Sequence, residues 1–134
     1  MINDQIKSRD FWMPFAPSIL AERAHDYLIN PKNVPAPYMI LAFHSTARAK
    51  RELRAAMHSY DMTLRPQIVE ERWNPAYYAL IKQFEKLTGI GAVLNTSYNL
   101  HGEPVVCNVA DALHVFSNSG LEYLSLGSFL LRKR

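Results

Sequence analysis

Cysteine is scarce in this chain of 134 residues, in which Cys107 is the only one. A disulfide within the chain and a zinc site rich in cysteine are excluded by that count, and a reducing compartment, the cytoplasm, is the expected location. Cys107 follows two valines, and no base can be identified beside it, so we expect a small buried residue rather than a nucleophile.

Long apolar runs are also missing. No run approaches the ~20 residues that a membrane span requires. Residues 1 to 10 lack the apolar core of a signal peptide. The sequence therefore predicts neither a membrane segment nor an export signal.

Glycine-rich motifs that bind phosphate do not occur. The five glycines are scattered, and neither GxxxxGK[ST] nor GxGxxG is present, so a phosphate site would have to be built from side chains. The five histidines form no HxH or HExxH pattern, which argues against a metal site within this chain.

The composition that remains is that of a folded protein. Apolar residues make up 49% of the chain and charged residues 20%, close to globular averages, and the length suits one domain over residues 1–134. The net charge of +3 suits a phosphate-bearing small molecule as well as a weak contact with nucleic acid.

Helical periodicity and capping residues predict four helices. They cover at least the second half of residues 16–29, about 47–57 after Thr46, 75–88 between Asn74 and Gly89, and 109–118 after Asn108.

Apolar or β-branched runs predict strands between these helices. They lie at residues 38–43, in pieces on both sides of Pro66, at 92–97, at 103–106 and at 123–133. Strands and helices alternate along the chain, which favours an α/β or α+β fold with helices packed on a twisted mixed sheet.

The stretch VLNTSYNLHGEP ends an apolar strand with uncharged hydrogen-bonding residues, namely Asn95, Thr96, Ser97 and Asn99. Ligands of open α/β sheets bind at the carboxyl ends of strands, so this segment is a candidate binding site. The alternative is that these side chains cap the strand and the following turn, as such residues commonly do.

Three cations stand among apolar residues, namely Lys7 and Arg9 in IKSRD and Arg65 in RPQ. A cation held against buried surface usually meets an anion, and both side-chain types bind phosphate oxygens. The alternative is that Lys7 and Arg9 pair with nearby carboxylates, namely Asp4, Asp10 or Glu22.

With these residues in hand, the chain resembles the C-terminal domain of the carbamoyltransferase family, which includes nodulation-factor and antibiotic-tailoring O-carbamoyltransferases. The similar motifs run in order from IKSRDFWMPFAPSIL through TLRPQIVEERWNPAYYALI, VLNTSYNLHGEPVV and DALHVF to YLSLGSFLLRK. The resemblance implies a YrdC-like fold that binds ATP and carbamoyl phosphate and forms carbamoyl-adenylate with release of pyrophosphate. It also implies a separate N-terminal domain with a metal site, in cis or in trans, that passes the carbamoyl group to an acceptor hydroxyl.

The resemblance assigns roles to particular residues. Lys7 and Arg9 would belong to a Lys-x-Arg anion site, and Arg65 would meet phosphate. Ser97 and Asn99 would hold the nucleotide or the carbamoyl group. Uncharged groups such as those two and Asn95 suit the neutral carbamoyl group and adenine, while fixed cations offset the repulsion between a carbamate and ATP. Mg²⁺ would accompany the ATP phosphates, held largely by the nucleotide and water.

Two positions depart from the family pattern as the resemblance gives it. Many members have arginine in place of Met13, which would remove a phosphate ligand here. Many have glycine in place of Met62, which would change the loop before Arg65.

Two other functions stay open at this stage. The basic helix at residues 48–54 could serve a non-catalytic RNA-binding module, although it lacks the interleaved aromatic residues that single-stranded nucleic acid usually stacks on. A regulatory remnant would bind ATP without releasing pyrophosphate. Whether the chain is a fragment or a stand-alone protein, we expect that it does not complete carbamoyl transfer by itself. A homo-oligomer is left open.

Overall fold

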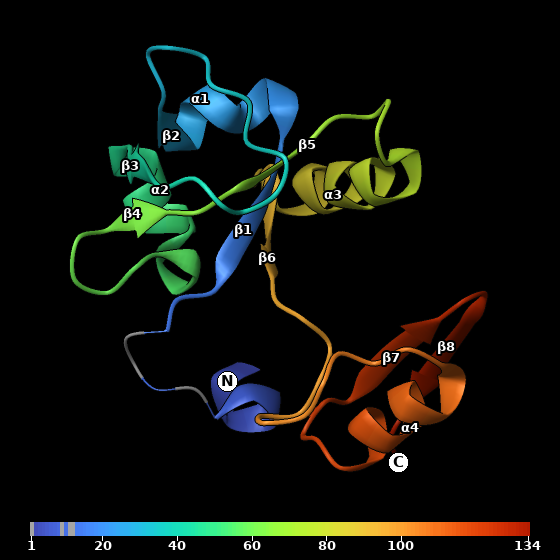
Figure 1. Ribbon diagram of the computed structural model, residues 1–134. Coiled ribbons are helices and arrows are strands. Elements are labelled where there is room, and N and C mark those ends of the chain that lie inside the picture. The colour runs from blue at the N-terminus through green and yellow to red at the C-terminus, as the bar shows by residue number, and fades with distance from the viewer. Residues whose placement is uncertain (1, 9, 11–12) are drawn as a thin grey trace. The chain divides into compact units, whose positions relative to one another are not determined.

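The computed structural model describes residues 2–8, 10 and 13–134. The chain forms two compact units, a smaller one of Met1–Asp10 with Ser97–Arg134 and a larger one of Phe11–Thr96. Their helices and strands are labelled in Figure 1. The expectation of a mixed α/β class is confirmed, and the expectation of one domain over the whole chain stays a prediction.

The larger unit is built on a sheet of three strands in the order β5-β1-β6. These are β1 (Ala16–Leu20), β5 (Gln67–Val69) and β6 (Ala92–Asn95). β1 runs parallel to β5 and antiparallel to β6. The sheet is mixed, as the sequence predicted, and β1 carries the pairing on both sides.

Helix was predicted for at least the second half of residues 16–29, and the first half is a strand. Residues 17–20 are buried and lie in β1. Since side chains on both faces of this strand are buried, its sequence lacks the alternation of a half-exposed strand. The second half is confirmed as a short helix. It consists of η2 (Ala21–Arg23) and α1 (Ala24–Tyr27), after which the chain enters β2 (Leu28–Ile29).

A second sheet has the order β2-β3-β4, with β3 (Phe43–Ser45) and β4 (Thr63–Leu64). The predicted buried strand at residues 38–43 is wrong. Tyr38 is 69% exposed and Ile40 is 76% exposed, and between them Met39 has φ 58°, which interrupts an extended chain. Only Phe43, at the end of the run, enters a strand.

The helix predicted after Thr46 is confirmed. It consists of α2 (Ala47–Glu52) and a 3₁₀ turn, η3 (Arg54–Ala56). The Thr46 hydroxyl accepts the Ala49 N–H at 3.1 Å and caps α2. The apolar face of this segment enters the main core, which contains Ile19, Tyr27, Leu28, Ala49, Leu53, Ala56, Met57, Leu64 and Ala92.

The longest helix, α3 (Pro75–Thr88), begins and ends as predicted. Asn74 Oδ1 accepts the Tyr77 N–H at 3.1 Å, and Gly89 follows with φ 77°, a left-handed conformation that glycine adopts without steric cost. Ile81 packs on Leu20 and Val69. This contact places α3 on one face of the sheet, beside β1 and β6 in Figure 1.

The free edge of β5 is met by a loop. The Ile68 N–H donates to the Ala36 carbonyl at 2.8 Å, and Ala36 stands between Pro35 and Pro37. A loop that contains these two prolines therefore covers part of this edge strand.

The smaller unit contains a π-helical turn, a helix and a hairpin. These are η1 (Asn3–Lys7), α4 (Val109–Ser117), β7 (Tyr123–Leu126) and β8 (Phe129–Arg132). Asn108 caps α4 as predicted, because its Oδ1 accepts the Asp111 N–H at 2.9 Å. Gly120 donates its N–H to the Gln5 carbonyl, which joins the chain after α4 to η1.

Two strand predictions for this unit are wrong. Residues 103–106 form no strand; Pro104 has no N–H to give to a ladder. Residues 123–133 were predicted as one strand and form the β7-β8 hairpin instead, since Gly127 with φ 60° reverses the chain.

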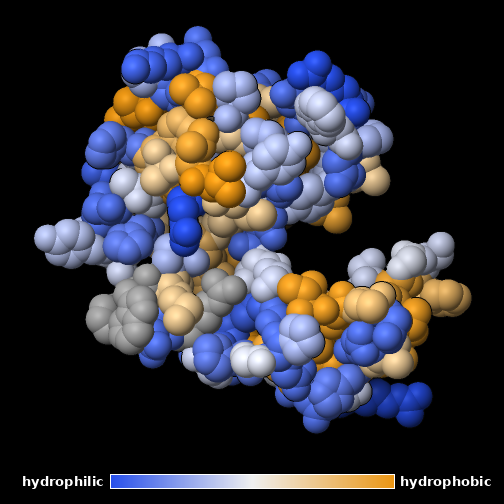
Figure 2. Space-filling model, in the orientation of Figure 1, coloured by the Kyte–Doolittle hydropathy of each residue, from blue (hydrophilic) through white to orange (hydrophobic). Residues whose placement is uncertain are grey.

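The surface retains many apolar side chains. Figure 2 shows them interspersed with polar ones on the visible face of the larger unit. Among the described residues, no helix has the length and apolar character needed to cross a membrane.

Candidate functional site

Lys7 lies at the centre of a polar cluster in the smaller unit. Its Nζ donates to Asn99 Oδ1 at 2.6 Å, to Ser97 Oγ at 3.1 Å and to the Asn99 carbonyl at 3.2 Å. The Ser97 hydroxyl also donates to Asn99 Oδ1, at 2.6 Å. Lys7 is 2% exposed, whereas Ser97 is exposed. These three acceptors are uncharged oxygens, and together they hold the ammonium in place.

The loop after Ser97 fixes the cluster from the other side. Asn99 Nδ2 donates to the carbonyls of Leu100 at 3.0 Å and Glu103 at 2.7 Å. Tyr98 points the other way, and its hydroxyl donates to the Ala112 carbonyl of α4 at 3.0 Å. Burial raises the pKa of Tyr98. The loop is thus held at residues 98 and 99, which orients the Asn99 carbonyl oxygen toward Lys7.

Asn95 belongs to a separate polar cluster on the sheet of the larger unit. Its Nδ2 donates to Ser18 Oγ and to Gln67 Oε1, each at 2.9 Å. The Ser18 hydroxyl donates to Gln67 Oε1 at 2.8 Å. The three residues come from β6, β1 and β5, so the ring of bonds joins all three strands. Sequence reasoning found Asn95 and missed Ser18 and Gln67, because their meeting depends on the register of the strands.

Arg65 is exposed in the larger unit, between β4 and β5. It has no ion-pair partner among the described residues. It lines a pocket of about 120 Å³ with Pro14, Phe15, Ala56, His58 and Thr63. A guanidinium that is not paired with a carboxylate is available to an anion.

The structure thus groups the predicted residues in two places. Lys7, Ser97 and Asn99 come together in the smaller unit, while Asn95 and Arg65 lie in the larger unit. Arg9 lies outside the described residues, so its predicted role stays a prediction.

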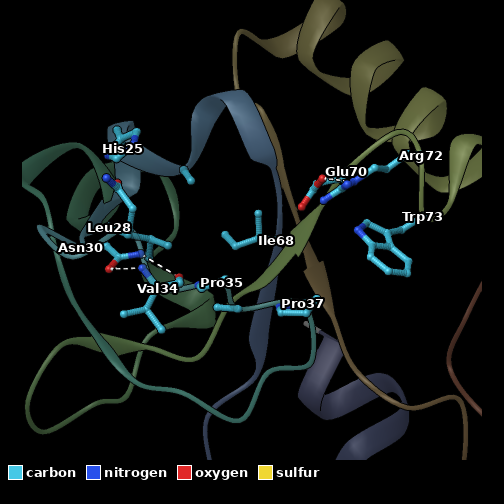
Figure 3. A pocket seen from close by; sticks show the side chains of 13 residues that line it. His25, Leu28, Asn30, Val34, Pro35, Pro37, Ile68, Glu70, Arg72 and Trp73 are labelled. Carbon is cyan, nitrogen blue, oxygen red and sulfur yellow. Dashed lines mark hydrogen bonds and ion pairs between the residues drawn. The ribbon is translucent and has the colours of Figure 1, made fainter.

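A pocket of about 470 Å³ in the larger unit is lined by none of the predicted site residues. Two pairs of its lining residues interact, namely Asn30 with Val34 and Glu70 with Arg72 (Figure 3). The Asn30 amide bonds both the N–H and the carbonyl of Val34 at 3.0 Å. Arg72 Nε lies 2.6 Å from Glu70, and the same guanidinium lies over the Trp73 ring at 5.3 Å. These bonds stabilise the pocket wall.

One other expectation is corrected by the side chains. Cys107 is exposed, so the expectation of a buried residue is wrong; its N–H bonds Asp111 at the start of α4 instead of entering the core. Within the described part of the chain, no group of three or more His, Cys, Asp or Glu side chains could hold a metal ion.

The basic helix considered for nucleic acid is partly neutralised. Arg48 Nε lies 2.9 Å from Glu52 Oε1, and its Nη1 lies 3.4 Å from Asp26. Arg48 also lies over the Tyr27 ring at 5.5 Å. This guanidinium stabilises the packing of α2 on α1, which weakens the case for an RNA-binding surface there.

Comparison with known proteins identifies relatives over nearly the whole chain. Residues 1–133 match the family model described as Carbamoyltransferase C-terminus. An uncharacterized protein of Methanocaldococcus jannaschii is 41% identical over 132 residues, which cover 98% of this chain and 25% of that protein. Nodulation protein NolNO of Sinorhizobium fredii is 39% identical over 134 residues, 99% of this chain and 20% of that protein. The 3'-hydroxymethylcephem-O-carbamoyltransferase of Amycolatopsis lactamdurans is 27% identical over 124 residues, 92% of this chain and 23% of that enzyme.

The chain therefore belongs to the carbamoyltransferase C-terminus family, and the resemblance predicted from its motifs is confirmed. It spans a quarter or less of the length of these relatives.

Proposed function

We propose that this chain binds ATP and carbamoyl phosphate and forms carbamoyl-adenylate, as the activating part of a carbamoyltransferase. The observation that carries the proposal is the buried ammonium of Lys7, held by the neutral oxygens of Ser97 and Asn99. A fixed cation of this kind is suited to offset phosphate charge. Its three N–H donors are all used, so a direct bond to a phosphate oxygen would replace one of these acceptors.

In the proposed reaction, water releases phosphate from carbamoyl phosphate and leaves carbamate. A carbamate oxygen then bonds the α-phosphorus of ATP, and pyrophosphate leaves. Both reactants are anions, so the contribution expected of the protein is positioning and charge compensation. In this proposal Lys7, Arg9 and Arg65 bind phosphate oxygens, and Asn95, Ser97 and Asn99 bind uncharged parts of the substrates.

Mg²⁺ would accompany the triphosphate and supply further charge compensation. Since the described residues contain no cluster of three or more metal-ligating side chains, the nucleotide and water are the ligands that fit it. Transfer to an acceptor hydroxyl is assigned to a separate N-terminal domain, in cis or in trans, because the relatives are several times longer than this chain.

Calorimetric titration with a non-hydrolysable ATP analogue tests the binding step. We expect Lys7→Met to lower the affinity at least tenfold, because the variant keeps the length of the side chain and removes its charge. Lys86→Met is the matched control, since Lys86 is an exposed lysine of α3. Equal affinity of the Lys7 variant and the wild type, with both folded by circular dichroism, would contradict the proposal.

A pyrophosphate-release assay with ATP, Mg²⁺ and carbamoyl phosphate tests the chemical step. Release that depends on carbamoyl phosphate supports adenylate formation. Binding of the ATP analogue without release would favour a regulatory nucleotide-binding role instead. Salt-sensitive RNA binding without nucleotide binding would favour the nucleic-acid alternative.

A further inference from the structure

The polar ring formed by Ser18, Gln67 and Asn95 occupies one end of a sheet face. On this face Leu20 and Val69 pack against α3. Side chains two residues apart in a strand share a face, so Ser18 and Gln67 continue the same face by one position each. Ser18 is fully buried, while Gln67 and Asn95 are half-buried. The sheet face is therefore apolar where it packs against α3, and next to this part it carries the partly accessible amides of Gln67 and Asn95.

The ring uses one end of each amide. Gln67 Oε1 accepts from Ser18 and from Asn95, and Asn95 Nδ2 donates to both partners. A primary amide has a carbonyl with two acceptor sites and an NH₂ with two donors. Gln67 Nε2 and Asn95 Oδ1 thus remain without a partner among the described residues.

The outward-facing atoms have the same chemistry in either orientation of the amides. If both amides rotate by 180° and the Ser18 hydroxyl reverses, the ring closes again with donors and acceptors exchanged. One amide then still presents a donor outward and the other an acceptor. A ligand that satisfies both must itself carry a donor and an acceptor side by side.

We propose that the Gln67–Asn95 amide pair binds the carbamoyl group of carbamoyl phosphate. This deepens the proposed function and rests on it. The carbamoyl group carries an NH₂ and a carbonyl on one carbon, so Asn95 Oδ1 accepts from its NH₂ while Gln67 Nε2 donates to its carbonyl. Ser18 does not touch the ligand and acts as a positioning residue that closes the ring.

The phosphate-binding role proposed for Arg65 favours carbamoyl phosphate over the adenine of ATP, which has a similar hydrogen-bonding edge. Arg65 precedes Gln67 by two residues and lies in the same unit. In carbamoyl phosphate the carbamoyl group is bonded directly to the phosphate that such a cation meets. In ATP a ribose separates the adenine from the phosphates.

The amide pair explains how the chain would select against acetyl phosphate. Acetyl phosphate has the same shape, with a methyl group in place of NH₂, and it cannot donate to Asn95 Oδ1. A half-buried acceptor left unpaired disfavours such a ligand. We therefore expect the wild-type chain to bind carbamoyl phosphate about tenfold or more tightly than acetyl phosphate.

The test compares the affinities for these two acyl phosphates, freshly dissolved, by calorimetry on the full chain. Gln67→Glu keeps an oxygen for the inward bonds and removes the outward donor. Gln67→Met has a similar size and removes both the oxygen that accepts the inward bonds and the outward donor. Any new charge acts on both acyl phosphates, so the ratio of the two affinities isolates the amide. We expect both variants to reduce the wild-type preference to less than threefold, with the affinity for the ATP analogue unchanged.

Each outcome decides the proposal. A preference that survives in both Gln67 variants overturns it, and so does a wild type that binds both acyl phosphates equally, although the proposed function then stands. Loss of ATP affinity with the acyl-phosphate preference intact shows that the pair binds adenine and overturns it too. A wild type that binds neither acyl phosphate nor ATP ends the proposed function together with this inference.

Discussion

The Nζ of Lys7 lies 2.6 Å from Oδ1 of Asn99, a residue 92 positions further along the chain. The same oxygen accepts the hydroxyl of Ser97 at 2.6 Å. The Asn99 amide oxygen thus orients both the Lys7 ammonium and the Ser97 hydroxyl. The amide nitrogen of the same side chain is fixed to main-chain carbonyls of the loop.

Replacing Asn99 with alanine should destabilise the chain by about 1–3 kcal/mol, because the Lys7 ammonium loses an acceptor and two loop carbonyls lose their donor. The free energy of unfolding in urea measures this effect. Asn118→Ala is a matched control in the same unit, since Asn118 is an exposed residue that donates to the His114 carbonyl at the end of α4. Equal losses in the two variants would show that Asn99 has no special structural role.

Arg65→Ala should lower the affinity for the ATP analogue at least tenfold and leave the free energy of unfolding nearly unchanged. The stability is expected to survive because Arg65 is exposed and has no ion-pair partner within the described chain. Arg72→Ala removes an exposed arginine from the same unit and should not alter the affinity. A parallel loss of affinity in both variants would indicate a non-specific effect of charge.

Glu52 should make stability depend on pH in the acid range. Burial acts to raise the pKa of Glu52, but hydrogen bonds from Tyr27 and Arg48 outweigh it, and the pKa lies below its ordinary value. A carboxylate with a lowered pKa stabilises the fold above its unfolded pKa, and this contribution is lost as pH falls through the folded value. Urea unfolding of Glu52→Gln between pH 7 and pH 3, roughly the window of carboxylate titration, should show a smaller decline than the wild type. An identical decline would place the acid sensitivity elsewhere.

Gly89→Ala should destabilise the chain by about 1–2 kcal/mol, because a residue with a Cβ is strained in the left-handed region. Gly89 has φ 77°, and a Cβ placed there meets nothing within 4 Å, so the cost is conformational rather than steric. Thermal unfolding provides the measurement. Gly89→Asn should lose less stability, since asparagine tolerates this conformation better than alanine. A larger loss for asparagine than for alanine would argue against this explanation.

Local signals in the sequence predicted local structure well. The caps at Thr46, Asn74 and Asn108 depend on a side chain and an N–H three residues away, so the sequence contains the whole interaction. Strands were harder to predict, because a short apolar run does not reveal whether it is buried. Residues 38–43 are the clearest failure, since Tyr38 and Ile40 face solvent.

The candidate site could not be predicted from local sequence pattern alone. Lys7 and Ser97 are 90 positions apart, and no periodicity links them; the motifs of the family resemblance placed them in one site. Ser18 and Gln67 escaped notice because each is an ordinary strand residue until the register sets them beside Asn95. Met62 shows that a departure from the family pattern can mark an unusual backbone conformation. It stands where the resemblance has glycine, and its φ of 56° is a conformation that glycine favours.

The short bond between Ala36 and β5 has a consequence for how the protein behaves in a crowded solution. An unprotected edge strand is a template on which another chain can build intermolecular sheet, and proline interrupts such growth because it lacks an N–H. Here two prolines flank Ala36, whose carbonyl accepts the Ile68 N–H, so we expect this border of the sheet to resist aggregation.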